Sequence, residues 1–263
     1  MNIIVCIKQV PGTSNVKVDP VTGVLIRDGI ENKINPFDLF ALETALTLKE
    51  ELGAQVTVVT MGPPPATQVI KEAIYMGADG GVLVSDRRFG GADVLATSYT
   101  LSSAIRTIGE FDLVLTGKQT TDGDTAQVGA ELAEFLKIPH FAGVTSISIE
   151  GDKLSYSATL DSKVISAEMA MPCLVCVDGE INTPRLPSYK RMLEFGSCED
   201  IIKVLSLDNF SDKDTSHYGL KGSPTQVERI FPPEVNDQKT VFEGEDEDLT
   251  DKVFSVLSEK KFI

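Results

Sequence analysis

The sequence predicts an α/β protein built on a doubly wound, mostly parallel sheet. Short strands rich in Val, Ile and Leu alternate with amphipathic helices through residues 1–140, and glycine or proline marks the loops between them. From about residue 143 the pattern changes to alternating polar and apolar residues, which indicates antiparallel strands added to the sheet.

The first half of the chain contains four predicted parallel strands. Each is short and almost wholly apolar, as expected of a strand that helices cover on both faces. They are Asn2–Lys8, Gln55–Met61, Gly81–Ser85 and Leu113–Thr116.

Four helices are predicted between and after these strands. The first is the best marked, because Asn35 is a favourable N-cap, Pro36 suits the first helical position and Asp38 falls in the positive first turn. Its apolar residues recur at spacings of three and four up to Leu52. The others run from after Pro65 to about Met76, from about Asp93 to Ile108, and from about Thr125 to Leu136.

The second half is predicted to hold three antiparallel strands, a further buried strand and an arm. The antiparallel strands are Val144–Ile149, Lys153–Leu160 and Lys163–Met169, with a hairpin turn at Glu150–Asp152, and the buried strand is Cys173–Val177. We expect residues 1–205 to form a nucleotide-binding α/β domain. Residues 206–263 are expected to form an extended C-terminal arm that packs on a partner, with a solvated tail as the alternative. The arm carries six carboxylates in Glu243–Asp251 and ends in a short amphipathic helix near Asp248–Lys260.

Composition excludes several classes of function. The formal net charge of −15 opposes binding to nucleic acid or to an anionic membrane surface, and no apolar run approaches the length of a membrane span. The N-terminal residues are typical of a strand and not of a secretory signal. Four cysteines make no disulfide framework, so we expect a reducing, cytoplasmic location. The two histidines are far apart in the sequence and leave little for a zinc site.

The segment from Leu113 to Gly129 is the most informative for function. A buried strand leads into a polar loop with small residues and then into a predicted helix, whose unpaired N–H groups would suit a phosphate. Ligands of open α/β sheets bind at the carboxyl ends of the strands, where this loop is expected. Alternatively, Asp124 caps the helix and the loop is ordinary. Neither standard nucleotide fingerprint, GxGxxG or GxxxxGK[ST], is present.

Other loops are expected at the same edge of the sheet. They are Asn35–Asp38, Met61–Pro63 and Ser85–Asp93, in which Arg87, Arg88 and the Gly90–Gly91 pair could meet an anionic ligand; ordinary turns with solvated arginines are the alternative. No set of residues suggests a side-chain catalyst. Cys173 and Cys176 have CxxC spacing, but residues three apart on a strand point to opposite faces, so we expect two core thiols that do not meet.

These motifs together resemble the β subunits of electron-transfer flavoproteins. The resemblance covers nearly the whole chain and is carried by Val5–Pro11, Asn35–Asp38, Met61–Pro63, Ala73–Asp79, Pro184–Arg185 and, most specifically, Gly117–Gly129. It implies a Rossmann-like fold and a heterodimer with an α subunit that carries its own FAD. In the housekeeping branch of the family the β subunit holds AMP, whereas in the electron-bifurcating branch it holds a second FAD that accepts hydride from NADH.

The start of the chain and the glycine-rich segment Ser85–Ser98 resemble the bifurcating branch. That branch, found in anaerobic metabolism, implies three further partners: NADH as substrate, ferredoxin as one electron acceptor, and an acyl-CoA or similar flavin-dependent dehydrogenase that receives electrons through the α-subunit FAD. Residues 186–196 depart from both branches where the family has its partner-recognition loop, so the identity of the dehydrogenase is left open. The alternatives are a housekeeping carrier that holds structural AMP and a free-standing adenine-nucleotide-binding regulatory module.

The resemblance also implies a set of cofactor-binding residues and no catalytic or metal-binding ones. Cys6, Asn35, Asp38 and Met61 would frame the adenosine. The segment Asp122–Val128 would bind the pyrophosphate through the N–H groups of residues 123–127, and Phe89–Thr97 would frame the flavin. The full set is Cys6, Asn35, Asp38, Met61, Gly62, Phe89, Gly90, Gly91, Asp93, Thr97, Gly117, Gln119, Thr120, Asp122, Gly123, Asp124, Thr125, Ala126, Gln127 and Val128.

Overall fold

The computed structural model describes residues 1–12, 17–18, 25–26, 32–160, 163–228 and 239–263. It divides into two compact units, Met1–Val227 and Glu228–Ile263. The first unit continues beyond the expected boundary at residue 205. The expected arm includes residues 229–238, which lie outside the described residues.

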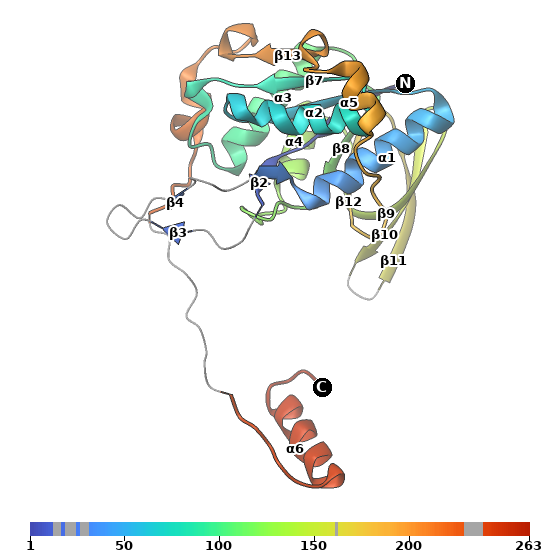
Figure 1. Ribbon diagram of the computed structural model, residues 1–263, viewed down its shortest axis with the longest axis vertical. Helices are drawn as coiled ribbons and strands as arrows, with labels where there is room; N and C mark the ends of the chain where they lie inside the picture. Colours follow the sequence, from blue (N-terminus) through green and yellow to red (C-terminus); the bar gives the residue numbers. More distant parts are fainter. Residues whose placement is uncertain (13–16, 19–24, 27–31, 161–162, 229–238) are drawn as a thin grey trace. The chain divides into compact units, whose positions relative to one another are not determined.

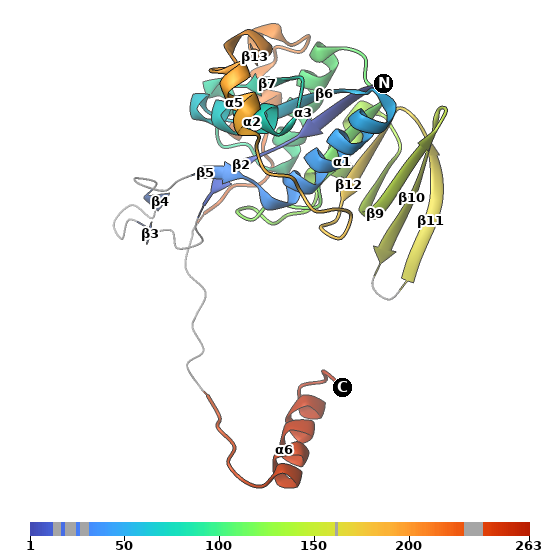
Figure 2. The same cartoon turned by 45° about the vertical axis from the view of Figure 1, so that its right-hand side comes forward.

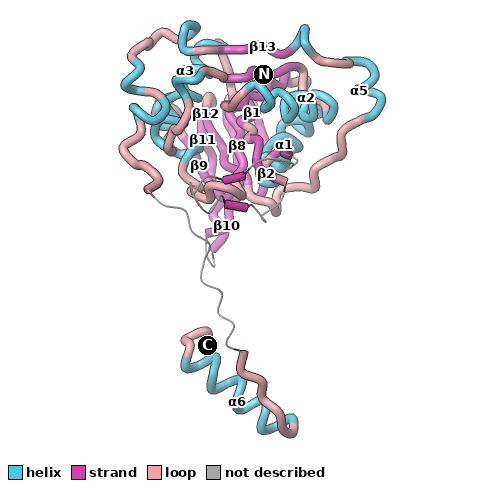
Figure 3. The backbone as a smooth tube through the Cα atoms, turned by 60° about the vertical axis from the view of Figure 1, so that its left-hand side comes forward, coloured by secondary structure: helices cyan, strands magenta, loops and turns pink. Residues whose placement is uncertain are grey.

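The described part of the first unit contains a nine-stranded sheet. Its strands lie in the order β11-β10-β9-β12-β8-β1-β6-β7-β13. The strands from β12 to β13 are parallel, and β9 pairs with β12 in parallel and with β10 antiparallel. Figure 2 shows β9, β10 and β11 projecting at one side, and Figure 3 shows β13 at the opposite edge. The strands are β1 (Asn2–Cys6), β6 (Gln55–Met61), β7 (Gly80–Val84), β8 (Leu113–Gly117), β9 (His140–Glu150), β10 (Lys153–Leu160), β11 (Lys163–Ala170), β12 (Cys173–Val177) and β13 (Ile202–Leu205).

Two smaller antiparallel pairs follow β1. They are β2 (Gln9–Pro11) with β5 (Asn32–Ile34), and β3 (Lys17–Val18) with β4 (Leu25–Ile26).

Helices cover both faces of the sheet, as the predicted class requires (Figure 1). The helices α1 (Pro36–Leu52) and α2 (Thr67–Met76) pack on one face, and α3 (Val94–Ile108) and α4 (Val128–Leu136) pack on the other. From β1 the chain adds β6 and β7 on one side, then returns through α3 to β8 on the other side of β1. This reversal creates a topological switch point at the carboxyl ends of β1 and β8.

The fourth predicted helix begins three residues later than expected. Residues 125–127 lie in the loop before α4, because Asp124 and Ala126 have φ angles of 52° and 55°, which no right-handed helix contains. The loop therefore keeps its own geometry up to Gln127, and the helical turn starts at Val128.

The stretch after residue 180 contains more structure than its composition predicts. It forms the helix α5 (Tyr189–Phe195) and the edge strand β13. Beyond β13 the segment 207–222 folds against α3, since Leu207, Phe210 and Tyr218 are buried in the same cluster as Phe89 and Leu101. The expectation that the arm begins at residue 206 is therefore corrected by these three buried side chains.

Two local predictions in the sheet are confirmed. Glu150 pairs with Lys153, so Gly151 and Asp152 form a two-residue hairpin turn. Cys173 and Cys176 belong to the cores on opposite faces of the sheet, and all four cysteines are free thiols.

The described part of the second unit contains the helix α6 (Asp246–Glu259). Three acidic residues occupy its first turn, where the helix dipole favours negative charge. Val253, Phe254 and Leu257 are exposed on it. No helix in the described parts of the chain is long and apolar enough to cross a membrane.

Candidate nucleotide site at the switch point

A cavity of about 600 Å³ opens at the switch point of the sheet. Its volume lies within the range of roughly 300–1,000 Å³ that is typical of cofactor sites. The cavity is bounded by the carboxyl ends of β1, β6 and β8, the loops that follow β7 and β8, and the first turns of α3 and α4.

The structure brings most of the predicted site residues together around this one cavity. The exceptions are Asn35, Gly62, Gly90 and Asp124, which do not line it. The predicted residues that line it are Cys6, Asp38, Met61, Phe89, Gly91, Asp93, Thr97, Gly117, Gln119, Thr120, Asp122, Gly123, Thr125, Ala126, Gln127 and Val128.

Sequence reasoning missed further residues that line the cavity. Most are chain neighbours of predicted ones, and extending the motifs by a few residues would have found them: Ile7, Lys8, Ala92, Val94, Leu101, Thr116, Lys118 and Gly129. Thr225 and Val227 also line it, and no motif in the sequence points to them.

Asn35 supports the cavity indirectly and is not the side-chain cap of α1. Its Nδ2 donates to the Gln119 carbonyl at 2.8 Å, and its Oδ1 accepts from the Thr121 N–H at 3.2 Å. Because Asn35 is fully buried, both hydrogen bonds tie the start of α1 to the loop after β8.

Three consecutive backbone N–H groups in the loop before α4 take no partner among the described residues: those of Thr125, Ala126 and Gln127. The predicted donors at 123 and 124 are already used, since the Gly123 N–H donates to Thr120 Oγ1 and Asp122 Oδ1 and the Asp124 N–H donates to the Thr120 carbonyl.

Asp124 does not cap α4. Its Oδ1 accepts from Gln119 Nε2 at 2.6 Å, and no side chain caps the helix. The free N–H groups of the loop and of the first helical turn are therefore available to an anion, which the helix dipole also favours.

Two lysines and two aspartates balance the charge around the loop. Lys8 pairs with Asp122, and Lys118 pairs with Asp178 at 2.9 Å. Burial alone would raise the pKa of Asp122, but hydrogen bonding to Lys8 and its charge hold that pKa below its usual value.

The arginines after β7 do not reach the cavity. Arg88 binds Asp86 through its Nε at 2.9 Å and also contacts Asp208. This arrangement fastens the loop to the segment after β13, so Arg88 is a structural residue.

Asp38 and Cys6 are two buried titratable side chains that line the cavity. Burial raises the pKa of Asp38 to about 7, although hydrogen bonds from Asn35 and from the Lys8 and Gly117 N–H groups oppose the rise. Burial, with smaller contributions from Asp38 and Cys176, raises the pKa of the Cys6 thiol to about 12. Cys6 is therefore an inert thiol at neutral pH, and Asp38 keeps its proton to a higher pH than an ordinary carboxyl group.

Thr116 lines the cavity, and the residue is 6% exposed. Its Oγ1 is buried and takes no hydrogen-bond partner among the described residues, although it lies close enough to the Cys176 thiol to oppose the rise in that thiol's pKa. Because that oxygen is closed off from solvent beneath Gly129 of α4, it offers no contact to a ligand.

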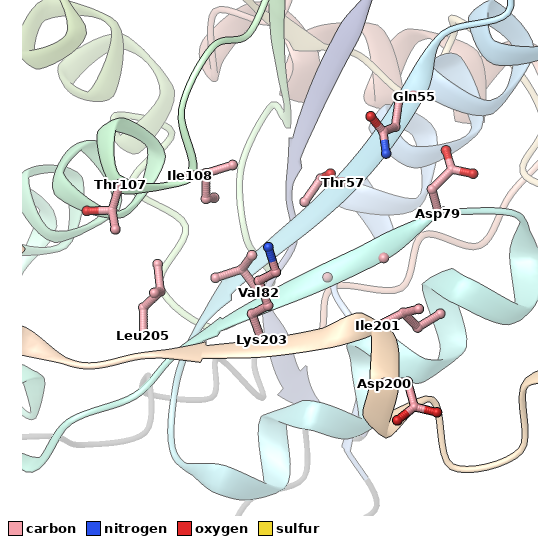
Figure 4. A pocket seen from close by; sticks show the side chains of 12 residues that line it. Gln55, Thr57, Asp79, Val82, Thr107, Ile108, Asp200, Ile201, Lys203 and Leu205 are labelled. Carbon is pink, nitrogen blue, oxygen red and sulfur yellow. The ribbon is translucent and has the colours of Figure 1, made fainter. Parts of the chain in front are cut away.

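A second cavity of about 330 Å³ lies at the opposite, amino-terminal edge of the strands. Figure 4 shows side chains from β6, β7 and β13 and from the end of α3 around it. Among them, Asp79 is already engaged by Lys49 and by the Val56 N–H. The switch-point cavity, which is lined by residues with free backbone N–H donors, is therefore the candidate site.

The described residues contain no cluster of His, Cys, Asp and Glu that could hold a metal ion. The sheet is doubly wound, and free N–H donors lie at its switch point. This arrangement is typical of nucleotide-binding α/β proteins.

Comparison with known proteins narrows this class. The family model for the electron transfer flavoprotein domain matches residues 22–197. The chain is 43% identical to the electron transfer flavoprotein subunit beta of Clostridium acetobutylicum over the full length of both chains. It therefore belongs to the β subunits of the electron transfer flavoprotein family, which pair with an α subunit.

Two relatives are components of reductase systems. Subunit CarD of the caffeyl-CoA reductase-Etf complex of Acetobacterium woodii is 43% identical over 89% of this chain and 88% of its own. The electron transfer subunit gamma of acryloyl-CoA reductase from Anaerotignum propionicum is 41% identical over 96% of this chain and 98% of its own.

Proposed function

We propose that this chain is the β subunit of an electron-bifurcating electron transfer flavoprotein. In this proposal FAD occupies the switch-point cavity and takes hydride from NADH. One of the two electrons passes to the α-subunit FAD and on to a dehydrogenase, and the other passes to ferredoxin. The names of the two reductase-linked relatives support an acyl-CoA-type partner.

The extent of the cavity is the observation that carries the proposal. The polar loop at residues 120–128 and the loop that carries Phe89, Gly91 and Thr97 line the same cavity. AMP would need only the polar loop and the residues that frame the adenosine, whereas FAD has a second, flat and largely apolar end. Phe89 and Leu101 offer that end an apolar wall.

The protein's own groups divide the binding of this cofactor. The free N–H groups at residues 125–127 would hold the phosphates, because both nearby lysines are already paired with aspartates. FAD, when bound, supplies the two-electron and one-electron chemistry, so no side-chain acid, base or nucleophile is required.

We further propose that the dehydrogenase docks on the segment 184–196. Arg185 anchors it to α1, since its backbone N–H and its Nε donate to Glu43 at 3.0 and 2.9 Å, and Arg191 Nε donates to the Ile74 carbonyl at 2.8 Å. Leu186 and Tyr189 are nonetheless 86% and 69% exposed. A firmly held backbone that presents apolar side chains to solvent is typical of an interaction surface.

We also propose that the second unit binds the α subunit. The apolar side chains of α6 have no cover among the described residues, and an amphipathic helix needs a partner surface to bury such side chains. We place the complex in the cytoplasm, because all four cysteines are reduced and buried.

The test is a count of nucleotides released from the heterodimer after co-expression with its α subunit. Two FAD and no AMP per complex would support the proposal, and NADH-driven reduction of ferredoxin would then be measured. One FAD and one AMP would overturn it and identify a one-flavin carrier instead.

A further inference from the structure

Residues from the end of the first unit complete the wall of the cavity. The segment Gly219–Val227, here called the strap, crosses the loop that follows β7, and its Thr225 and Val227 line the cavity. Val227 is 80% exposed, so its apolar side chain would gain cover from a bound ligand.

Backbone contacts seat the start of the strap on the loop. The Leu220 N–H donates to the Gly90 carbonyl at 3.0 Å. At Gly219, with φ of 56°, a Cβ would lie 2.1 Å from the Arg88 carbonyl oxygen, so only glycine permits this approach.

Hydroxyl groups fasten the rest of the strap to Asp93. The Asp93 N–H donates to Ser223 Oγ at 2.8 Å, and the hydroxyl and N–H of Thr225 donate to Asp93 Oδ2 at 2.7 and 3.0 Å. Ser223 is itself buried and donates to the Gly219 carbonyl at 2.7 Å.

Both carboxylate oxygens of Asp93 are therefore committed to the protein. Oδ1 accepts from the Ala96 N–H as the N-cap of α3, and Oδ2 holds Thr225. Burial opposes ionisation, but the hydrogen bonds from Ala96 and Thr225 outweigh it and keep the pKa of Asp93 below its usual value. Asp93 is thus an anion whose two oxygens already accept three hydrogen bonds from the protein.

We propose that the strap retains the flavin end of the bound cofactor and that Asp93 and Thr225 form the latch that holds it closed. Asp93 is then a positioning residue for the site and not a ligand. The Leu220 N–H joins the strap to the Gly90 carbonyl, in the loop that carries Phe89 and Gly91, so we place the strap at the flavin end of FAD. This inference rests on the proposed function, because AMP would not reach the strap.

The experiment uses the heterodimer loaded with its natural cofactors. Thr225→Val removes the hydroxyl while keeping the shape and the backbone hydrogen bond. Asp93→Ser removes the second oxygen while keeping a favourable N-cap for α3. Thr225→Ser keeps the hydroxyl and should restore retention. Ser216→Ala is the matched control, since it removes a Ser–Asp hydrogen bond of 2.7 Å from the same region of the chain but outside the cavity.

Two measurements read the latch. Flavin release, followed by the fluorescence of freed FAD, should become roughly tenfold faster for one of the two flavins in Thr225→Val and Asp93→Ser, as expected for losing a hydrogen bond to a charged group. Hydrogen exchange of the strap amides should rise in the same variants. Thr225→Ser and Ser216→Ala should match the wild type in both.

The outcomes separate the latch from the proposed function. In the first outcome, both latch variants still hold two FAD, and their flavin release and the hydrogen exchange of their strap amides match the wild type. That outcome would overturn the latch alone. A wild-type complex that holds one FAD and one AMP would overturn the proposed function, and with it the flavin end that the strap is inferred to retain.

Discussion

At the scale of single residues, Asp38 makes stability depend on pH. Its pKa of about 7 in the folded chain exceeds the ordinary value of 3.8, so between those two values the folded state holds a proton that the unfolded state has released. Stability from this group therefore falls as pH rises from about 4 to 7.

Asp38→Asn should remove this penalty and keep an acceptor for the Lys8 N–H, which binds Asp38 Oδ2 at 2.7 Å. The variant should gain a few kcal/mol over the wild type between pH 5 and pH 7.5. Denaturant unfolding of both proteins at the two pH values measures the gain. If the free energies of unfolding of the two proteins changed equally with pH, the pKa of Asp38 would not be raised in the folded chain.

Asn35 is the second residue with a separable effect. Asn35→Ala should cost about 1–3 kcal/mol and weaken nucleotide binding, because it leaves the Gln119 carbonyl and the Thr121 N–H without their buried partner. Asn182→Ala is the control, since Asn182 also holds α1 through the Phe40 carbonyl at 3.0 Å but lies outside the cavity. Calorimetric titration with nucleotide should distinguish them, and equal affinities in the two variants would contradict a role for Asn35 at the site.

At the scale of elements, the position of α4 depends on close packing against the sheet. Cys6, Thr116 and Cys176 lie side by side on β1, β8 and β12. Gly129 in the first turn of α4 rests on this row, and a Cβ there would lie 2.3 Å from Cys176 Sγ. Any larger residue must push the free N–H groups of the loop away from the cavity floor.

Gly129→Ala should therefore destabilise the chain by about 1–3 kcal/mol and weaken nucleotide binding. Cys176→Ala removes the sulfur that a new Cβ would meet, so the double variant should recover much of the loss. A double-mutant cycle of melting temperatures and affinities measures the coupling. Additive effects would mean that α4 tolerates the extra methyl group without this contact.

The elements also show what the sequence predicts well and where it fails. Strands such as Gln55–Met61 are predictable because a run this short, rich in β-branched residues and bounded by turn residues, favours a strand over a helix. The start of α4 is not, because the positive φ angles of Asp124 and Ala126 follow from tertiary contacts rather than local preference. The sequence does not predict the strap. Phe210 and Tyr218, which are buried just before it in the chain, follow no regular spacing.

At the scale of the whole molecule, the chain joins the unit that holds the candidate site to a second unit whose described residues include no buried side chain. Val253, Phe254 and Leu257 of α6 are exposed, and no residue of that helix is buried. Such a unit gains its stability from a partner, so its contribution should appear in association and not in the folding of the first unit.

Phe254→Asp should accordingly weaken association with the α subunit by tenfold or more, since it replaces a large apolar contact with a charge that association must desolvate. The melting temperature of the full β chain without its α subunit should not change, because Phe254 lies outside the first unit. Ser255→Ala, on the same helix, serves as the control because its hydroxyl bonds only within the helix, to the Asp251 carbonyl at 2.8 Å. Sedimentation of mixed subunits measures the association. Equal affinity of Phe254→Asp and Ser255→Ala for the α subunit would show that α6 lies outside the subunit interface, and the dehydrogenase or ferredoxin would then be tested as its partner.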